Sequence, residues 1–140
     1  MDFSFTKQLS VGNRIIDSAY KKIFDMLNRV ECLIRANNHH ALSGTFDLLE
    51  DYLADCFLME EYIAQAVNFP FAQHALAHQH LLNMIQSIKN ELVSFNGVWS
   101  DTAADHYPKL LRDCFMRHIK DESEPMRIIL NAQFYDFKPS

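Results

Sequence analysis

The sequence has few of the residues that interrupt helices. Only 3 of its 140 residues are glycine and 4 are proline, and this scarcity argues against turn-rich β structure. Cysteine is also scarce, since the chain has 3 cysteines and no CxxC pair. An odd, small number of cysteines favours free thiols in a reducing compartment. We therefore expect a helical protein of the cytoplasm.

Long apolar runs and an excess of positive charge are missing as well. No apolar stretch approaches the roughly 20 residues that are needed to span a bilayer. The opening segment MDFSFTKQLS has neither the basic part nor the apolar run of a signal peptide, so none is expected. The formal net charge of −5 gives no electrostatic reason to expect nucleic acid or an anionic membrane as a partner. The sequence identifies no protein partner.

Helical periodicity is the main pattern that is present. A composition of 49% hydrophobic and 22% charged residues is typical of a globular protein, and the length predicts a single domain over 1–140. Core-type residues recur at alternating steps of four and three in four segments. The four sets are Ile16, Tyr20, Ile23, Leu27, Val30 and Ile34; Leu42, Phe46, Leu49, Leu53, Cys56, Glu60, Ile63 and Val67; Phe71, His74, His78, Leu81, Ile85, Ile88, Leu92 and Phe95; and Tyr107, Leu111, Cys114 and His118.

Helix-breaking segments separate these four sets. They are ANNHHALSG between the first two, Pro70 between the next two, and NGVWSD before the last. Gly97 stands where a left-handed residue that ends a helix is expected. Four amphipathic helices with short links predict an all-α fold, an antiparallel up-down-up-down four-helix bundle with an N-terminal arm and a short C-terminal segment.

Two prolines leave the limits of the last helix open. Because of Pro108, this helix begins either near Asp101 or only near Tyr107. Pro125 either ends the helix or restarts it as a short terminal helix, with Ser123 as the candidate N-cap.

Polar side chains interrupt the core-facing sets. A buried polar group without a partner destabilises the fold by about 1–3 kcal/mol, and an unpaired buried carboxylate does so by more. Several such groups would remove most of a typical folding stability of about 5–15 kcal/mol. They must therefore hydrogen-bond to one another or share a ligand, and a cation is the simplest such ligand. The interrupting residues are Tyr20, Cys56, Glu60, His74, His78 and His118.

The spacing of these residues is compatible with a metal site. Residues four apart lie on one face of a helix, so His74 and His78 can bind the same ion. Taken singly, each residue also fits an ordinary structural role: the histidine pair could lie on the surface, His118 could be a core histidine bonded to a carbonyl, and Glu60 could be a boundary carboxylate. Three histidines and one carboxylate on the core faces of three consecutive helices favour the metal site. Such a ligand set suits iron or zinc.

Four segments resemble the motifs of hemerythrin-like proteins, a family that includes the bacteriohemerythrins. Together they cover nearly the whole chain in the family's order. SVGNRIIDSAYKKIFDMLNRV resembles the first-helix I-D-x-x-H motif, CFLMEEY resembles H-F-x-x-E-E, FPFAQHALAHQHLL resembles Y-P…H-x-x-x-H-x-x-F-L, and CFMRHIKDES resembles W-L-x-x-H-I-x-x-x-D.

The resemblance implies a four-helix bundle with two carboxylate-bridged irons that bind O2 reversibly. Carried over residue by residue, it makes His74, His78 and His118 the three histidines of one iron. Glu60 matches a bridging carboxylate.

The other half of the family's site is replaced. Tyr20 and Cys56 stand where the histidines of the second iron are expected, and Ser123 stands where the second bridging aspartate is expected. Two dications about 3.5–4 Å apart repel by roughly 17–19 kcal/mol at an effective dielectric of 20, so they need bridging anions and terminal ligands. We therefore expect one ion and no family-type diiron O2 carriage. The resemblance favours iron as this ion, and zinc remains an alternative. A second site would need Glu122 as a replacement carboxylate, or Tyr20 and Cys56 as phenolate and thiolate ligands.

Three functions are compatible with this pattern. The first is a metal-binding bundle with a single ion, used to bind or sense the metal or a small diatomic ligand of the O2 type. The second is a metal-free interaction or scaffold bundle that kept the fold. The third is an enzyme, but no nucleophile–base pair or phosphate loop appears, so none is expected.

Overall fold

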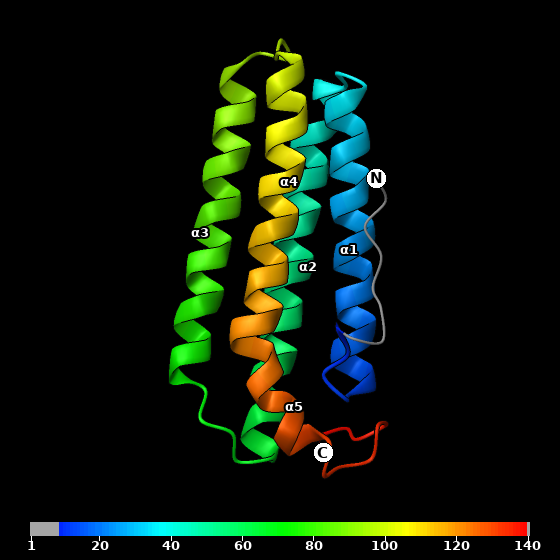
Figure 1. Ribbon diagram of the computed structural model, residues 1–140, viewed down its shortest axis with the longest axis vertical. Coiled ribbons are helices and arrows are strands. Elements are labelled where there is room, and N and C mark those ends of the chain that lie inside the picture. Colours follow the sequence, from blue (N-terminus) through cyan, green and yellow to red (C-terminus); the bar gives the residue numbers. More distant parts are fainter. Residues whose placement is uncertain (1–8, 140) are drawn as a thin grey trace.

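The structure is a computed structural model that describes residues 9–139, and in it the chain is a bundle of helices packed side by side (Figure 1). No β-strand occurs among these residues. The elements are α1 (Arg14–Arg35), α2 (His39–Ala66), α3 (Ala72–Ser94), α4 (Asp101–His118), the π-helical turn η2 (Ile119–Ser123) and the short α5 (Glu124–Leu130).

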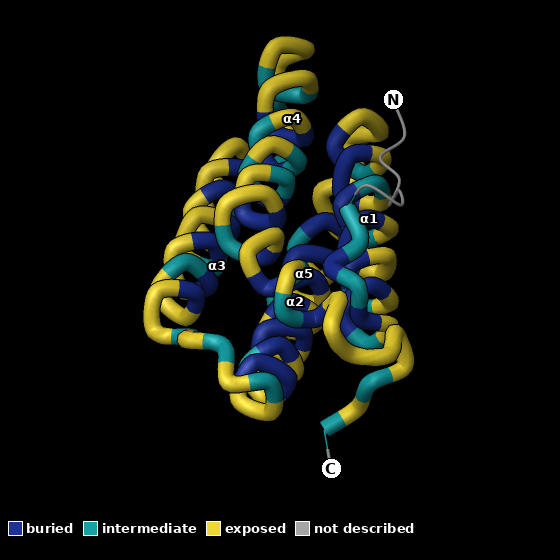
Figure 2. The backbone as a smooth tube through the Cα atoms, turned by 60° about the horizontal axis from the view of Figure 1, so that its bottom comes forward, coloured by how far each residue is buried: buried dark blue, intermediate teal, exposed yellow. Residues whose placement is uncertain are grey.

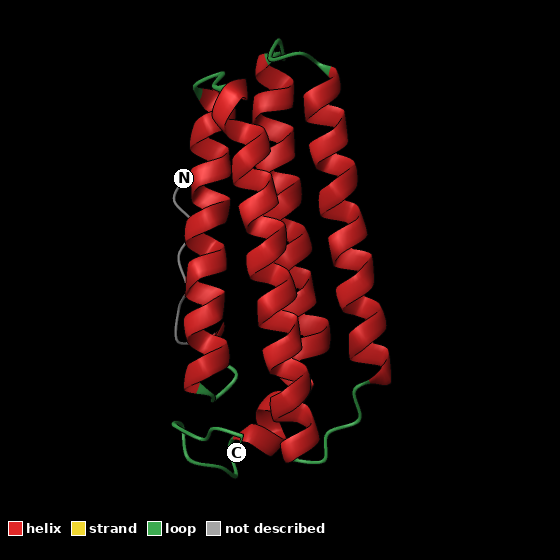
Figure 3. Cartoon of the chain, turned by 180° about the vertical axis from the view of Figure 1, so that it is seen from behind, coloured by secondary structure: helices red, strands yellow, loops and turns green. Residues whose placement is uncertain are grey.

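The four long helices form a closed antiparallel ring. Contacts join α1 to α2, α2 to α3, α3 to α4, and α4 back to α1, and short loops connect them at the two ends of the bundle (Figure 3). The predicted up-down-up-down four-helix bundle is confirmed. None of the described helices is both long enough and apolar enough to cross a membrane.

Asparagines end the first three long helices. Asn37, Asn68 and Asn96 have φ values of 54°, 61° and 52°, the left-handed conformation that lets a chain turn out of a helix. Gly97 follows with φ 78°, so the predicted left-handed residue at this place is confirmed, although Asn96 precedes it in the same conformation. Asn13 begins α1 by accepting hydrogen bonds from the backbone N–H groups of residues 15 and 16.

The core consists of the inward stripes that the spacing predicts. Buried positions face the inside of the bundle and exposed positions face outward (Figure 2), as the buried residues on α1 to α4 require. Four predicted members differ: Phe95 is 39% exposed, and Val67, Phe71 and Cys114 are only half-buried. Phe115, the neighbour of Cys114, is 1% exposed. Phe115 packs edge-on against Tyr20 and Phe24, with ring centroids 5.6 and 5.2 Å away.

The structure decides where α4 begins and shows that the predicted N-cap role of Ser123 is wrong. The helix begins at Asp101 and contains Pro108 in its interior, where the proline ring is buried. Ser123 does not act as an N-cap, because its side chain makes no capping hydrogen bond to α5. Instead α4 runs through η2 into α5, and the N–H of Glu124 donates to the carbonyl of Ile119, five residues back. This wider turn stands directly before Pro125, which has no N–H to continue the α-helical pattern.

The chain ends close against the start of α1. The N–H of Arg14 donates to the carbonyl of Tyr135 at 2.9 Å, and the amide of Asn13 donates to the carbonyl of Phe137 at 3.0 Å. Asp17 is 1% exposed and accepts from the Tyr135 hydroxyl at 3.0 Å. The predicted C-terminal segment is therefore attached to α1, while residues 1–8 of the predicted N-terminal arm lie outside the described residues.

Candidate metal centre

The antiparallel arrangement brings five sequence-distant polar residues to one end of the bundle. The N-terminal halves of α1 and α3 lie beside the C-terminal halves of α2 and α4, and together they form the lower half of the bundle in Figure 1. Tyr20, Glu60, His74, His78 and His118 all lie there, and none is more than 6% exposed. Each one occupies an inward stripe, which is why helical spacing alone places it in the core.

Glu60 is at the centre of this group. Its Oε2 lies 2.9 Å from Nε2 of His74 and 3.1 Å from Nε2 of His78. One ligand atom from each of Glu60, His74, His78 and His118 lies within 4.8 Å of the other three. The structure thus brings together the four residues that the sequence predicts as metal ligands.

Aromatic rings hold the imidazoles in place. Phe57 stacks on His78 with ring centroids 3.6 Å apart and an angle of 8° between the ring planes. Phe71 stacks on His74 at 4.7 Å and 11°. These contacts orient both rings toward Glu60. This stacking was not predicted from the sequence. Its only sign there is that Phe57 lies three residues before Glu60 and Phe71 three residues before His74.

The second oxygen of Glu60 has different partners. The Tyr20 hydroxyl donates to Oε1 at 2.6 Å, and the Cys56 thiol donates to the same atom at 3.6 Å. The Tyr20 oxygen also lies 2.6 Å from the hydroxyl of Ser123, which is itself 1% exposed. Tyr20, Cys56 and Ser123 therefore form a hydrogen-bonded cluster on this side. The contact between Tyr20 and Ser123 was not predicted.

Burial and hydrogen bonds shift the pKa values of these groups. Burial raises the pKa of Glu60, but the hydrogen bonds from His74 and His78 outweigh it and bring this pKa to about 2. Burial lowers the pKa of His118 to about 3, despite the nearby charge of Glu60, and burial lowers that of His78 as well. At neutral pH and without metal, Glu60 is a carboxylate, and the lowered pKa values keep the imidazoles of His78 and His118 neutral.

Tyr20 and Cys56 remain protonated under the same conditions. Burial first, and then the negative charge of Glu60, raises the pKa of the Tyr20 phenol and that of the Cys56 thiol well above their ordinary values. Both groups are neutral donors to Glu60.

The donor set has the chemistry of a metal site, and its two closest contacts have the spacing of ligands that share an ion. Two ligand atoms about 2.1 Å from the same ion at tetrahedral angles lie about 3.4 Å apart, which is close to the 2.9 and 3.1 Å contacts around Oε2 of Glu60. Nε2 of His118 is buried and has no hydrogen-bond partner among residues 9–139. An unpaired buried nitrogen beside a carboxylate is what a metal ligand leaves when no ion is bound. The role of these four residues as ligands stays a prediction.

The structure separates the remaining candidates from this group. Glu122 is half-buried and does not join the four ligand atoms, although its charge acts on His78. The other four histidines of the chain are all exposed: His39, His40, His80 and His106.

Comparisons with known proteins agree with this architecture. A protein named Bacteriohemerythrin from Pseudomonas aeruginosa (strain LESB58) is 23% identical over 133 residues, covering 83% of this chain and 86% of that relative. Another of that name from Stenotrophomonas maltophilia (strain R551-3) is 20% identical over 130 residues, covering 92% of this chain and 82% of the relative. No family model and no solved structure matches. The similarity extends over most of both chains and agrees with the four-helix bundle, and it supports a distant relationship to the hemerythrin-like family.

Proposed function

We propose that the chain binds a single metal ion through His74, His78, His118 and Glu60. The observation that carries this proposal is the buried group of three imidazoles and one carboxylate whose ligand atoms lie within 4.8 Å of one another. The family relationship and this cluster together suggest metal binding. The similarity to bacteriohemerythrins favours iron, and imidazole with carboxylate is also a ligand set for zinc.

The partners of Glu60 favour one ion over two. Oε2 faces the imidazoles, whereas Oε1 already accepts from Tyr20 and Cys56. A second cation on the Oε1 side would have to displace both donors. It would also find a serine hydroxyl at position 123 in place of a carboxylate. One cation would therefore neutralise Glu60 at Oε2, while Oε1 keeps its hydrogen bonds from the Tyr20 hydroxyl and the Cys56 thiol.

The proposed use of the site is binding or sensing rather than catalysis. A bound iron ion would supply a Lewis-acidic, redox-active centre with coordination positions left for a small diatomic ligand of the O2 type. The protein residues bind the ion, orient it and exclude water, because all four ligands are buried. We propose a cytoplasmic location, which the free thiols of Cys32, Cys56 and Cys114 support.

Metal content tests this proposal directly. We expect about one ion per chain in protein purified without chelator or affinity metal, and loss of the ion in His78→Ala, because that change removes an imidazole in contact with Glu60. His106→Ala removes an exposed histidine from α4 and is the matched control, expected to keep the ion. Two ions per chain, or none after anaerobic preparation, would contradict the proposal.

A metal-free scaffold is the second candidate, and one observation favours it. Glu60 has four hydrogen-bond partners without any ion, so most of the polar core is already satisfied. A scaffold predicts that a chelator leaves the melting temperature unchanged. A bound metal raises the melting temperature by linkage, and a chelator then lowers it.

A further inference from the structure

Two clefts approach the polar cluster from opposite sides of the bundle. One lies between α3 and α4, has a volume of about 430 Å³ and includes His118 in its wall. The other lies between α1 and α2, has a volume of about 520 Å³ and includes Cys56. Both His118 and Cys56 lie next to Glu60. Each cleft therefore leads from the surface toward the same buried centre.

Negative charge predominates in the cleft between α3 and α4. Asp113, Asp121 and Glu122 line it together with one guanidinium, that of Arg117, a formal excess of two negative charges. Asp113 and Asp121 are exposed, while Glu122 is half-buried. The carboxylates thus lie at increasing depth along the way to the cluster, and a cation meets a favourable potential along this path.

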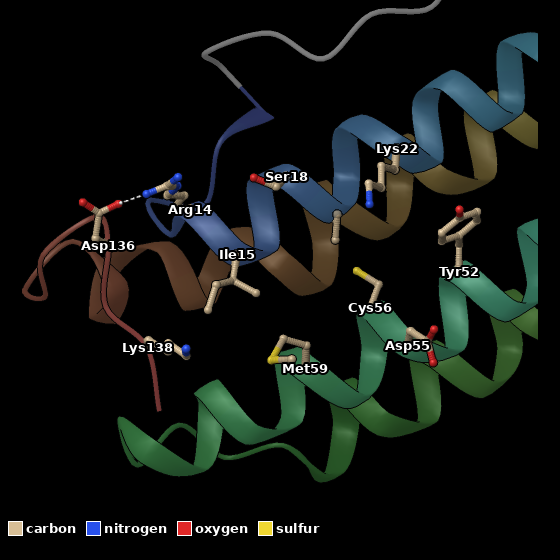
Figure 4. Close-up of a pocket in the computed structure, with 11 residues that line it drawn as sticks. Arg14, Ile15, Ser18, Lys22, Tyr52, Asp55, Cys56, Met59, Asp136 and Lys138 are labelled. Atoms are coloured by element: carbon tan, nitrogen blue, oxygen red, sulfur yellow. Dashed lines mark hydrogen bonds and ion pairs between the residues drawn. The ribbon is translucent and has the colours of Figure 1, made fainter. Parts of the chain in front are cut away.

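Positive charge predominates in the cleft between α1 and α2. Figure 4 shows Arg14, Lys22 and Lys138 around it, with Arg14 joined to Asp136 at 3.3 Å and Asp55 on the α2 side. These groups give a formal excess of one positive charge. A dication that approaches from this side meets a net positive charge of one, which repels it.

The inner ends of the two clefts also differ. His118 is 6% exposed and its Nε2 has no hydrogen-bond partner among residues 9–139, so it can accept a cation without breaking an existing bond. Cys56 already donates its proton to Glu60. An arriving cation would therefore meet an unpaired ligand nitrogen in the wall of the α3–α4 cleft.

We propose that the metal cation reaches the buried centre through the cleft between α3 and α4, guided by Asp113, Asp121 and Glu122 and received by His118. This inference rests on the proposed function, since it needs a metal site to reach. Charge placed along such a path changes association rates by about 10–1,000-fold when it acts fully, and salt screens the effect. The carboxylates therefore act on the rate of uptake more than on the number of ions bound.

The rate of Co²⁺ uptake tests the proposed path, because coordination by imidazole gives Co²⁺ visible absorption bands that stopped-flow mixing can follow. The variant with Asp113→Asn and Asp121→Asn should take up Co²⁺ at least about fivefold more slowly than wild type at low salt. This difference should largely vanish near 1 M salt, where the Debye length is about 3 Å. The matched control carries Asp55→Asn and Asp136→Asn, the same charge change in the other cleft, and should keep the wild-type rate.

A variant that narrows the cleft provides a second test of the uptake path. Ala77 lines the α3–α4 cleft, so Ala77→Phe should narrow it and slow uptake at every salt concentration, with circular dichroism used to check folding. Normal Co²⁺ stoichiometry with equal rates in the two double variants overturns the inference and leaves the proposed function intact. A wild-type protein that binds no Co²⁺ overturns both.

Discussion

Each oxygen of the Glu60 carboxylate has its own partners. Oε2 contacts two imidazoles, and Oε1 accepts from a phenol and a thiol. A carboxylate has about four lone-pair sites, two on each oxygen, so all its acceptor capacity is used. Glu60 thus lies between two parts of the polar core. The imidazoles on its Oε2 side could bind a cation, and the donors on its Oε1 side form hydrogen bonds.

Removing the Tyr20 hydroxyl should destabilise the protein even without metal. Tyr20→Phe leaves Oε1 of Glu60 and the Ser123 hydroxyl without their shortest contacts, both 2.6 Å. We expect the free energy of unfolding to fall by about 1–3 kcal/mol, because buried polar groups lose a partner. Urea denaturation of the metal-free protein measures this loss.

Tyr62→Phe is the matched control for that substitution. Tyr62 is 50% exposed on α2, so losing its hydroxyl should change stability by less than about 0.5 kcal/mol. Combining Tyr20→Phe with Ser123→Ala should be less destabilising than the sum of the two single changes, since the two hydroxyls share a bond. Equal losses in Tyr20→Phe and Tyr62→Phe would contradict the buried cluster.

At the scale of elements, two glycines differ in what their backbone requires. Gly97 has φ +78°, and a Cβ added there would collide with the ring of His39. Gly44 lies inside α2, where nothing lies within 4 Å of an added Cβ. The same substitution should therefore have opposite effects at the two positions.

Glycine-to-alanine variants test this difference. Gly97→Ala should lower the free energy of unfolding by at least about 1 kcal/mol, because an L-residue is strained at positive φ. Gly44→Ala should raise it by about 0.5–1 kcal/mol, because alanine has a higher helix propensity. Thermal melting of both variants measures the sign, and a stabilised Gly97→Ala protein would show that the turn after α3 differs from the one described.

The elements also show how far sequence reasoning reaches. Regular spacing predicted the inward faces of α1, α2 and α3, and hence that Glu60 meets His74 and His78, because a helical period fixes which residues share a face. The end of α4 could not be predicted in this way. The π-helical turn inserts a longer hydrogen-bonded ring, and Ser123 at its end is buried beside Tyr20 and makes no capping hydrogen bond, although it directly precedes α5.

Local pattern also failed where tertiary packing decides. Pro108 lies inside α4 although proline disfavours a helix interior, since its buried ring contributes to the core. Phe115, and not Cys114, is the fully buried residue on its turn of α4. Only the packing of Phe115 against rings on α1 distinguishes these two neighbours.

For the whole molecule, the two ends of the bundle have different compositions. The half that holds residues such as Ile34, Leu49 and Leu92 is mainly apolar, although Glu31 is buried there and pairs with Arg112 at 2.9 Å. The other half holds the imidazoles and Glu60. The apolar half supplies hydrophobic stabilisation, which allows the polar half to keep unpaired atoms such as Nε2 of His118.

The metal-free protein should lose stability in acid, and His118 should account for part of this loss. The pKa of His118 is about 3 in the folded protein, against an ordinary value of 6.5. Between these values the unfolded chain binds a proton at this residue and the folded chain does not, so the free energy of unfolding falls as pH falls from about 6.5 to about 3. Glu60, with a folded pKa of about 2, adds a loss in the same direction below its ordinary value of 4.5.

His118→Leu separates the contributions of His118 and Glu60 to this pH dependence. It also tests whether the unpaired histidine destabilises the metal-free protein. Leucine removes the unpaired buried nitrogen, so at pH 7 the metal-free variant should be as stable as wild type or up to about 2 kcal/mol more stable. Its stability should fall less steeply between pH 6.5 and 3, while the loss due to Glu60 remains. Urea titrations at a series of pH values measure both effects. If the variant keeps the wild-type pH dependence, or is strongly destabilised at pH 7, then His118 stabilises the metal-free core and is not a ligand kept at the expense of stability.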